Sequence, residues 1–288
     1  MANVSAEPKL SDMNYRVVST LGSGAGSTTL LISDRTRGGK RFALKVVRRQ
    51  DADDDVYIAQ AKVEYEVSQK LNHPAIVRIY DARIKKNWLF RTSGVELLME
   101  YVDGRTLDEL EGPTIDQLVL IFNHVASALV HMHRRGVYHG DLKPSNIMLS
   151  KDGAVKLIDF GTAWRKGEDK GRVQGTPQYM APEQATEKIV DDRTDVYNFG
   201  ATMYRMFTGR YANTGSPGAP RSNKEKLPTP LQLNPRTPGT LNETIMNCLE
   251  INPEKRPAGM FEVQHQLAAV AKYLGIENIE LKGAINED

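Results

Sequence analysis

Short runs of β-branched and apolar residues dominate the first third of this 288-residue chain. Five such runs, separated by turns that contain Gly or Lys, lie at 15–21, 28–33, 41–47, 77–84 and 89–101. Runs of this length and composition are typical of β-strands. One segment between them has helical spacing instead, with apolar side chains at Val56, Ala59, Val63, Val67 and Leu71, and His73-Pro74 follows as a stop. The pattern predicts a small antiparallel β-rich lobe with one helix.

After Gly104 the spacing becomes that of amphipathic helices, at 115–135, 194–208, 241–250 and 259–273. Two stretches rich in charge, Gly or Pro, at 165–174 and 209–240, are expected to be irregular. We therefore expect an α+β fold with a small N-terminal lobe at 15–101 and a larger, mainly helical lobe at 104–275, joined by a hinge at 100–103. In this scheme residues 1–14 are an N-terminal extension and residues 276–288 are a polar C-terminal tail.

Composition restricts the protein class only weakly. The chain has 38 basic and 36 acidic residues, a net charge of +2, which gives no reason to expect a nucleic-acid or membrane-surface partner. Cys248 is the one cysteine, so an intrachain disulfide and a thiolate zinc cluster are both excluded. The most apolar segment, at 118–130, is too short and too polar to span a bilayer, and the polar start lacks the apolar core of a signal peptide. These features predict a soluble, cytoplasmic protein without a membrane segment.

A β-hairpin is predicted where two apolar runs, at 147–150 and 155–158, flank Lys151-Asp152-Gly153. An antiparallel hairpin places Asn146, before its first strand, beside Asp159, after its second. Asp141 and Lys143 lie just upstream, on the loop that enters the same end. Two carboxylates, an amide oxygen and an ammonium at one point suit the binding of Mg²⁺ and phosphate. Any one of these residues alone would more often be a turn cap, so it is their convergence that indicates a site.

A glycine-rich turn at the end of the first strand consists of Leu21, Gly22, Ser23, Gly24, Ala25, Gly26, Ser27, Thr28, Thr29 and Leu30. Backbone N–H groups in such a turn can approach phosphate oxygens. Because no helix follows it, the turn fits neither the dinucleotide fingerprint nor the Walker P-loop. Lys45 follows one hairpin later, within reach of the same phosphates. Glu64 and Glu66, on the two flanks of the apolar stripe of the predicted helix, are its candidate partners.

Four further motifs follow in order along the chain: Phe42-Ala43-Leu44-Lys45, Tyr138-His139-Gly140-Asp141-Leu142-Lys143-Pro144-Ser145-Asn146, Asp159-Phe160-Gly161 and Met180-Ala181-Pro182-Glu183. With the glycine-rich turn, this set resembles the eukaryotic-type protein kinase family over residues 15–273. The segments at 71–77 and 175–183 are most similar to those of bacterial Hanks-type Ser/Thr kinases. The resemblance implies the two-lobed protein kinase fold, with a kinase domain at 15–275.

The resemblance also implies a role for each matching residue. Asp141 accepts the proton of the substrate hydroxyl, Lys143 contacts the γ-phosphate, and Thr176 hydrogen-bonds beside them. Asn146 and Asp159 hold Mg²⁺, or Mn²⁺ in its place, and Lys45 grips the α- and β-phosphates of ATP with Glu64 as its favoured partner. The implied ATP site is completed by the glycine-rich turn, Ala43, Met99 as gatekeeper, and Glu100 and Val102 of the hinge. Glu183 is expected to pair with Arg256, and Asp195 to tie the helical core to the catalytic loop.

The sequence departs from the family pattern at three places. In the glycine-rich turn, Ser27 stands at the third glycine position and Thr29 at the customary valine position, which predicts weaker phosphate binding and poorer cover of the adenine. Gly140 replaces the arginine that in the family pairs with a phosphate on the activation loop. The only hydroxyl between Gly161 and Thr176 is that of Thr162, so we expect activity without activation-loop phosphorylation. Residues 210–226 lack helical apolar spacing, and 216–226 in particular are expected to be irregular.

Together these features predict an ATP-dependent kinase that phosphorylates Ser and Thr of protein substrates and has no nucleic-acid partner. A pseudokinase that acts only by binding is one alternative, although such proteins typically lose a residue equivalent to Lys45, Asp141 or Asp159, and all three are present. A kinase of small molecules is another, disfavoured by the 175–183 segment, which in protein kinases shapes a platform for peptides. The sequence leaves the oligomeric state open.

Overall fold

The computed structural model describes residues 7–24, 26–49, 51, 53–168, 174–186, 190–213, 227–276 and 281. The chain divides into two compact units, which we describe one at a time. Unit 1 comprises Met1–Asn72, Val77–Asp103 and Asp159–Gly161, and unit 2 comprises His73–Ile76, Gly104–Ile158 and Thr162–Asp288. The boundaries predicted from the sequence for the lobes, the hinge and the two terminal segments stay predictions.

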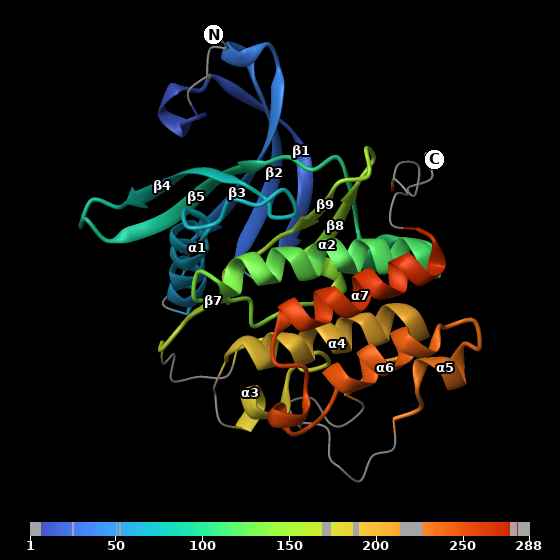
Figure 1. The fold of residues 1–288 in the computed structure, drawn as a ribbon. Coiled ribbons are helices and arrows are strands. Elements are labelled where there is room, and N and C mark those ends of the chain that lie inside the picture. Colours follow the sequence, from blue (N-terminus) through green and yellow to red (C-terminus); the bar gives the residue numbers. More distant parts are fainter. Residues whose placement is uncertain are drawn as a thin grey trace. The chain divides into compact units, whose positions relative to one another are not determined.

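Unit 1 is built on a five-stranded antiparallel sheet with the strand order β1-β2-β3-β5-β4 (Figure 1). Its elements are β1 (Tyr15–Gly24), β2 (Ser27–Asp34), β3 (Lys40–Arg48), helix α1 (Asp55–Ser68), β4 (Ile79–Lys86) and β5 (Thr92–Glu100). All five predicted strands and the predicted helix are present. β5 begins at Thr92 and not at residue 89, because a turn braced by the Asn87 side chain occupies the positions after β4.

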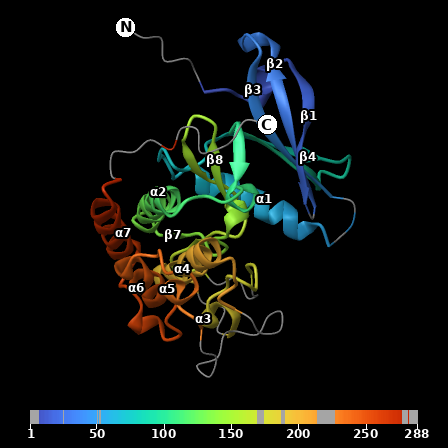
Figure 2. The same cartoon turned by 90° about the vertical axis from the view of Figure 1, so that its right-hand side faces the viewer.

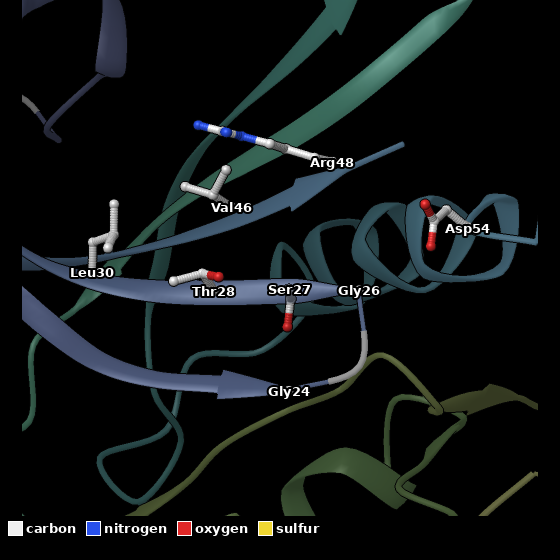
Figure 3. A pocket seen from close by; sticks show the side chains of 8 residues that line it. All are labelled: Gly24, Gly26, Ser27, Thr28, Leu30, Val46, Arg48 and Asp54. Atoms are coloured by element: carbon white, nitrogen blue, oxygen red, sulfur yellow. The ribbon is translucent and has the colours of Figure 1, made fainter. Parts of the chain in front are cut away.

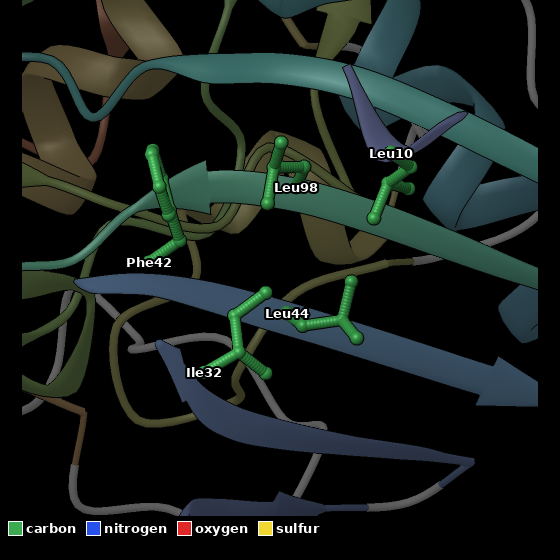
Figure 4. Packing of buried hydrophobic residues seen from close by; sticks show 5 residues of the cluster. All are labelled: Leu10, Ile32, Phe42, Leu44 and Leu98. Carbon is green, nitrogen blue, oxygen red and sulfur yellow. The ribbon is translucent and has the colours of Figure 1, made fainter. Parts of the chain in front are cut away.

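A hydrophobic cluster on one face of this sheet joins Leu10 to Ile32, Phe42, Leu44 and Leu98 (Figure 4). Leu10 lies in a short 3-10 helix, Leu10–Asp12, and its N–H donates to the Asp81 carboxylate at 2.7 Å. Burial of a leucine side chain contributes about 1.5–3 kcal/mol. Part of the predicted N-terminal extension therefore belongs to the core of unit 1.

Unit 2 is mainly helical, with α2 (Ile115–His133), α3 (Pro182–Thr186), α4 (Asp192–Thr208), α5 (Pro230–Leu233), α6 (Gly239–Cys248) and α7 (Met260–Leu274). α2 begins at a capping box in which Thr114 and Gln117 satisfy each other's backbone N–H groups, and it lies side by side with α7 (Figures 1 and 2). Within the described part of the chain, α2 alone has the length and hydropathy of a membrane span. Over half of it is buried in the protein, as expected of a core helix.

Two small sheets complete unit 2 and include elements that the sequence pattern missed. β6 (Gly104–Thr106), β8 (Ile147–Ser150) and β9 (Val155–Leu157) form one sheet, and β7 (Val137–Tyr138) pairs with β10 (Trp164–Arg165) in the other. The prediction of irregular structure at 165–174 and 209–240 was wrong for Arg165 of β10, for α5 and for the first two residues of α6. β10 and α5 are too short for a period to be recognised in the sequence. Contacts with neighbouring elements stabilise them instead. The expectation for residues 216–226 lies outside the described residues.

Candidate active site

The ammonium of Lys45 and the carboxylate of Glu64 form a buried ion pair in unit 1. Lys45 Nζ lies 2.7 Å from Glu64 Oε2 and 3.4 Å from Asp159 Oδ1. The Glu64 side chain is 1% exposed, on the face of α1 that packs on the sheet, whereas Glu66 on the other flank is exposed. Of the two candidate partners, Glu64 is thus the one that contacts Lys45.

Opposite charges hold this lysine in its charged form. Burial alone would lower the pKa of Lys45, but the carboxylates of Glu64 and Asp159 outweigh that effect and raise it. Lys45 is therefore an ammonium at any physiological pH, fixed in position by two acceptors. A fixed cation of this kind suits the binding of an anionic ligand such as a phosphate chain.

Asp159 has an unusual backbone conformation, with φ at +66°. This left-handed region is uncommon for residues other than glycine, although Asp tolerates it better than most. The next residue, Phe160, is fully buried, and the Gly161 N–H donates back to Asp159 Oδ1 at 3.3 Å. The conformation thus turns the carboxylate toward Lys45 while its neighbour anchors the turn in the core.

In unit 2, Asp141 lies at the centre of a second polar cluster. Thr176 donates its N–H to Asp141 Oδ1 at 2.7 Å, and Lys143 Nζ lies 3.2 Å from Asp141 Oδ2. Lys143 also donates to Thr176 Oγ1 at 3.0 Å, so the three side chains form one network. Asn146 Nδ2 donates to the Asp141 carbonyl at 2.9 Å, which leaves the amide oxygen of Asn146 as its ligating atom.

The predicted hairpin is present as β8 and β9, with Ile147 opposite Leu157. The Ile158 N–H donates to the Asn146 carbonyl at 2.9 Å, and Asp159 follows Ile158 in the chain. Asn146 and Asp159 therefore leave the same end of the hairpin. A carboxylate and an amide oxygen are suitable ligands for Mg²⁺, which usually keeps several waters and binds phosphates as well. Each of these two residues thus offers an oxygen of the type that suits such an ion.

Asp195, fully buried on α4, anchors the start of the loop that carries Asp141. Its carboxylate accepts the N–H of His139 at 2.7 Å, the N–H of Gly140 at 2.8 Å and a hydrogen bond from His133 Nε2 at 2.8 Å. Burial alone would raise the pKa of Asp195, but these hydrogen bonds and the neighbouring imidazoles hold it below its usual value. A charged carboxylate is thus built into the fold to fix the loop backbone.

The comparisons with known proteins agree with this geometry. The family model of the protein kinase domain matches residues 15–268. The chain belongs to the protein kinase family. Membership implies that the protein uses ATP together with a divalent metal ion, and the five-stranded sheet with α1 followed by a mainly helical region is the protein kinase fold.

Several curated relatives of this kinase come from bacteria. It is 34% identical over 277 residues to the serine/threonine-protein kinase PknB of Mycobacterium tuberculosis, covering 91% of this chain and 43% of that one. It is 31% identical over 267 residues to a probable serine/threonine-protein kinase of Clostridium acetobutylicum, covering 89% of this chain and 40% of the relative. The chain thus spans about two fifths of the length of the curated relatives that it matches.

The glycine-rich turn of the kinase joins β1 to β2, with Gly24 paired to Ser27. Thr29 is opposite Lys45 in the β2–β3 register, so both side chains lie on one face of the sheet, while Ala43 is opposite Met99 on β5. The Glu100 N–H donates to the Arg78 carbonyl at 2.8 Å. Ala25, also placed in the ATP site by resemblance, lies outside the described residues.

A cavity of about 460 Å³ beside this turn is not the expected ATP site. It is lined by Gly24, Gly26, Ser27, Thr28, Leu30, Val46, Arg48 and Asp54 (Figure 3). Side chains alternate along a strand, so Val46 and Arg48 lie on the face opposite to Lys45. The lining of this cavity and the expected phosphate-binding residues have only the glycine-rich turn in common.

The sequence reasoning missed Gln184, the residue after Met180-Ala181-Pro182-Glu183. It is 1% exposed, and its Nε2 donates to the Gly140 carbonyl at 2.6 Å and to the Gln174 carbonyl at 2.8 Å. Its Oε1 accepts from the Ala181 N–H and from Asn198 Nδ2. One amide thus joins the catalytic loop to the segment that carries Thr176. Its position beside a motif was the only signal in the sequence.

Gly140 itself has a conformation that other residues seldom adopt. Its φ is +72°, and a Cβ atom here would lie 3.1 Å from Cδ1 of Trp164. The N–H of Gly140 is held by Asp195 and its carbonyl by Gln184. The backbone at this position is therefore fixed on both sides without a side chain.

The expected pair of Glu183 and Arg256 is present as a bidentate ion pair with N–O distances of 2.7 and 2.8 Å. Arg256 also donates to three backbone carbonyls, and its guanidinium stacks on the Tyr197 ring, 4.9 Å from the centroid. Elsewhere in unit 2, a cavity of about 310 Å³ is lined in part by Lys143, Tyr179, Asp108 and Arg205.

Proposed function

We propose that the protein transfers the γ-phosphoryl group of ATP to Ser and Thr hydroxyls of protein substrates. The network of Asp141, Lys143 and Thr176 is the observation that carries this proposal. In this network the Asp141 carboxylate, which would accept the substrate proton, lies 3.2 Å from the Lys143 ammonium, which would contact the phosphate. The names of the bacterial relatives support the choice of Ser and Thr.

In this mechanism, the substrate oxygen forms a bond to the γ-phosphorus while the bond from that phosphorus to the bridging oxygen of ADP breaks. Asp141 accepts the hydroxyl proton, and Lys143 balances charge on the transferred group. Lys45, held by Glu64, orients the α- and β-phosphates. Asn146 and Asp159 would hold Mg²⁺, or Mn²⁺ in its place, which neutralises phosphate charge when bound.

A labelled-ATP assay tests this function. Label on Ser and Thr of a general protein substrate should fall at least about a thousandfold in Asp141→Asn, because general base and positioning contributions are lost together. Asp152→Asn is the matched control, since Asp152 lies in the exposed turn at the other end of the β8–β9 hairpin. Equal label in wild type and Asp141→Asn would overturn the proposal and favour a pseudokinase. Label transferred only to small metabolites would favour the other alternative.

We further propose that activity needs no phosphate on the activation loop. Gly140 offers no side chain to bind one, and Gln184 connects the Gly140 and Gln174 carbonyls without any charge. Thr162 is the one hydroxyl between Gly161 and Thr176. Enzyme treated with a phosphatase, and confirmed phosphate-free by mass spectrometry, should keep its rate within about twofold. A severalfold gain from a phosphate at 161–176 contradicts this.

The cytoplasm is the proposed location of the activity, based on the single cysteine of the chain, which suits a reducing compartment. Cell fractionation of the full protein tests it, and recovery of the kinase region from an extracellular fraction would refute it.

A further inference from the structure

The turn between β4 and β5 exposes three consecutive apolar residues, Trp88, Leu89 and Phe90, which we call the aromatic tip. Their exposed fractions are 85%, 50% and 82%. A single exposed apolar residue is ordinary, but neighbouring aromatic side chains left in water are not. The hairpin projects beyond the rest of its sheet at this end (Figure 1).

The backbone of the tip is held in a defined conformation. Asn87 Oδ1 accepts the N–H groups of Leu89 and Arg91 at 3.0 Å, and the Phe90 N–H donates to the Asn87 carbonyl at 2.9 Å. Phe90 has φ at +58°, which is unfavourable for a bulky residue. Four hydrogen bonds, including that of the Asn87 N–H to the Arg91 carbonyl, keep the turn in this form. The backbone that carries the aromatic rings is thus ordered in advance of any binding.

Basic residues flank the tip on both strands. Positions 83–95 carry four basic residues, Arg83, Lys85, Lys86 and Arg91, and no acidic residue. Glu96 pairs with Arg83 and Lys85, whereas Lys86 and Arg91, next to the tip, are exposed and form no ion pair with a described residue. The overall charge of +2 conceals this local excess of positive charge.

We propose that the aromatic tip docks onto an anionic lipid surface. Trp and Phe would enter the interface between headgroups and acyl chains, while Lys86 and Arg91 meet the negative headgroups. Lysine is depleted in protein–protein interfaces, where aromatic anchors fill pockets, so this composition favours a bilayer over an acidic protein. Each basic residue near such a surface increases affinity about fivefold.

Within unit 1, the docking surface is separate from the residues of the implied ATP site at the end of β5. Met99 and Glu100 lie at the far end of β5, roughly 25 Å from Thr92, which follows the tip, at the rise of an extended strand. Membrane binding and phosphoryl transfer can therefore be measured independently, and failure of one leaves the other intact.

Tryptophan fluorescence provides a direct test. The chain has two tryptophans, and Trp164 is 2% exposed, so a change on binding reports on Trp88. Vesicles of phosphatidylcholine with about a third phosphatidylglycerol should shift the emission to the blue, and brominated acyl chains should quench it. Vesicles of phosphatidylcholine alone should bind at least about tenfold more weakly.

Vesicle co-sedimentation compares the variants. The double variant Trp88→Ala, Phe90→Ala should bind anionic vesicles at least about tenfold more weakly than wild type, with an unchanged melting temperature and unchanged kinase activity on a soluble peptide. Phe261→Ala, which removes a 56%-exposed aromatic ring on α7, should bind as wild type does. Lys86→Gln should reduce the affinity for anionic vesicles about fivefold. Lys70→Gln, which changes an exposed lysine two residues after the end of α1, should not.

Three results would overturn the proposal. One is equal binding of wild type and the double aromatic variant to anionic vesicles. A second is equal binding to neutral and anionic vesicles. The third is the absence of a blue shift with vesicles together with a Trp88 response to a soluble acidic polypeptide, which would assign the tip to a protein partner.

Discussion

Replacement of Gln184 by Glu changes one nitrogen to oxygen at the junction between the catalytic loop and the segment that carries Thr176. The amide nitrogen donates to the carbonyls of Gly140 and Gln174, at 2.6 and 2.8 Å. In Gln184→Glu both contacts become oxygen against oxygen. Because the side chain is 1% exposed, water cannot restore the lost donors.

The size of the effect follows from the two contacts. A buried carbonyl that loses its donor costs about 1–3 kcal/mol, so an ionised carboxylate at position 184 should reduce the free energy of unfolding by about 2–6 kcal/mol. A protonated carboxyl keeps one O–H donor, which limits the loss to about 1–3 kcal/mol. Burial raises the pKa of a carboxyl group, so the loss should be smaller at pH 6 than at pH 8.

Activity should change in a specific way. The kcat should fall at least about tenfold, because Thr176 and Asp141 lose their shared support, a loss of about 1.4 kcal/mol or more in the transition state. The KM for ATP should stay within about twofold, since Lys45 and Glu64 lie in the other unit.

Urea unfolding and steady-state kinetics at pH 6 and pH 8 measure both effects. Gln264→Glu is the matched control, since it adds the same charge at a partly exposed position of α7. A kcat of Gln184→Glu within twofold of wild type at pH 8, with unfolding free energy within about 0.5 kcal/mol, would refute the role assigned to Gln184.

Four further predictions concern unit 2. Gly200→Ala should lower the melting temperature despite the better helix propensity of Ala, because the new Cβ would lie 2.5 Å from Cβ of Cys248, whereas Gly239→Ala, with open space around it, should not. In the native protein, burial raises the pKa of Cys248 to about 12, so a thiol reagent should label it only at the rate of unfolding. Arg256→Lys should cost about 3 kcal/mol in urea unfolding, since lysine cannot form the bidentate pair. Asp195→Asn should reduce the free energy of unfolding most at neutral pH, because the pKa of the native Asp195 carboxyl is lowered. The contribution of the charged carboxylate to stability is complete above about pH 4 and disappears as the pH falls through the pKa of the folded state. Unfolding curves from pH 3 to pH 7 would contradict this if the two proteins differed equally throughout.

Local sequence patterns were sufficient for most of the fold. The strands of unit 1 and the long helices of unit 2 were predicted to within a few residues, since each has enough positions for its period to be recognised. The β8–β9 hairpin was predicted as well, because an Asp-Gly turn between two apolar runs also determines the register. From that register alone, Asn146 and Asp159 were expected at one end.

Other features depend on contacts between distant residues, and there the sequence was ambiguous. Helical periodicity placed Glu64 and Glu66 on equivalent flanks, and only the packing of α1 on the sheet brought Glu64 to 2.7 Å from Lys45. Gln184 had no pattern of its own, because the partners of its amide are carbonyls 10 and 44 residues away.

The same distinction applies to the surfaces. The sequence placed Trp88 between two predicted strands and assigned Phe90 to the second of them, at 89–101. Their exposure was decided by Asn87, whose side chain closes the turn before β5 begins. The sequence alone thus determined the kinase family, the strands of unit 1 and the long helices of unit 2, and it predicted residues for the candidate site. The tertiary structure decided which charged and polar side chains meet and which apolar ones stay in water, since burial and hydrogen bonding are properties of the packed chain.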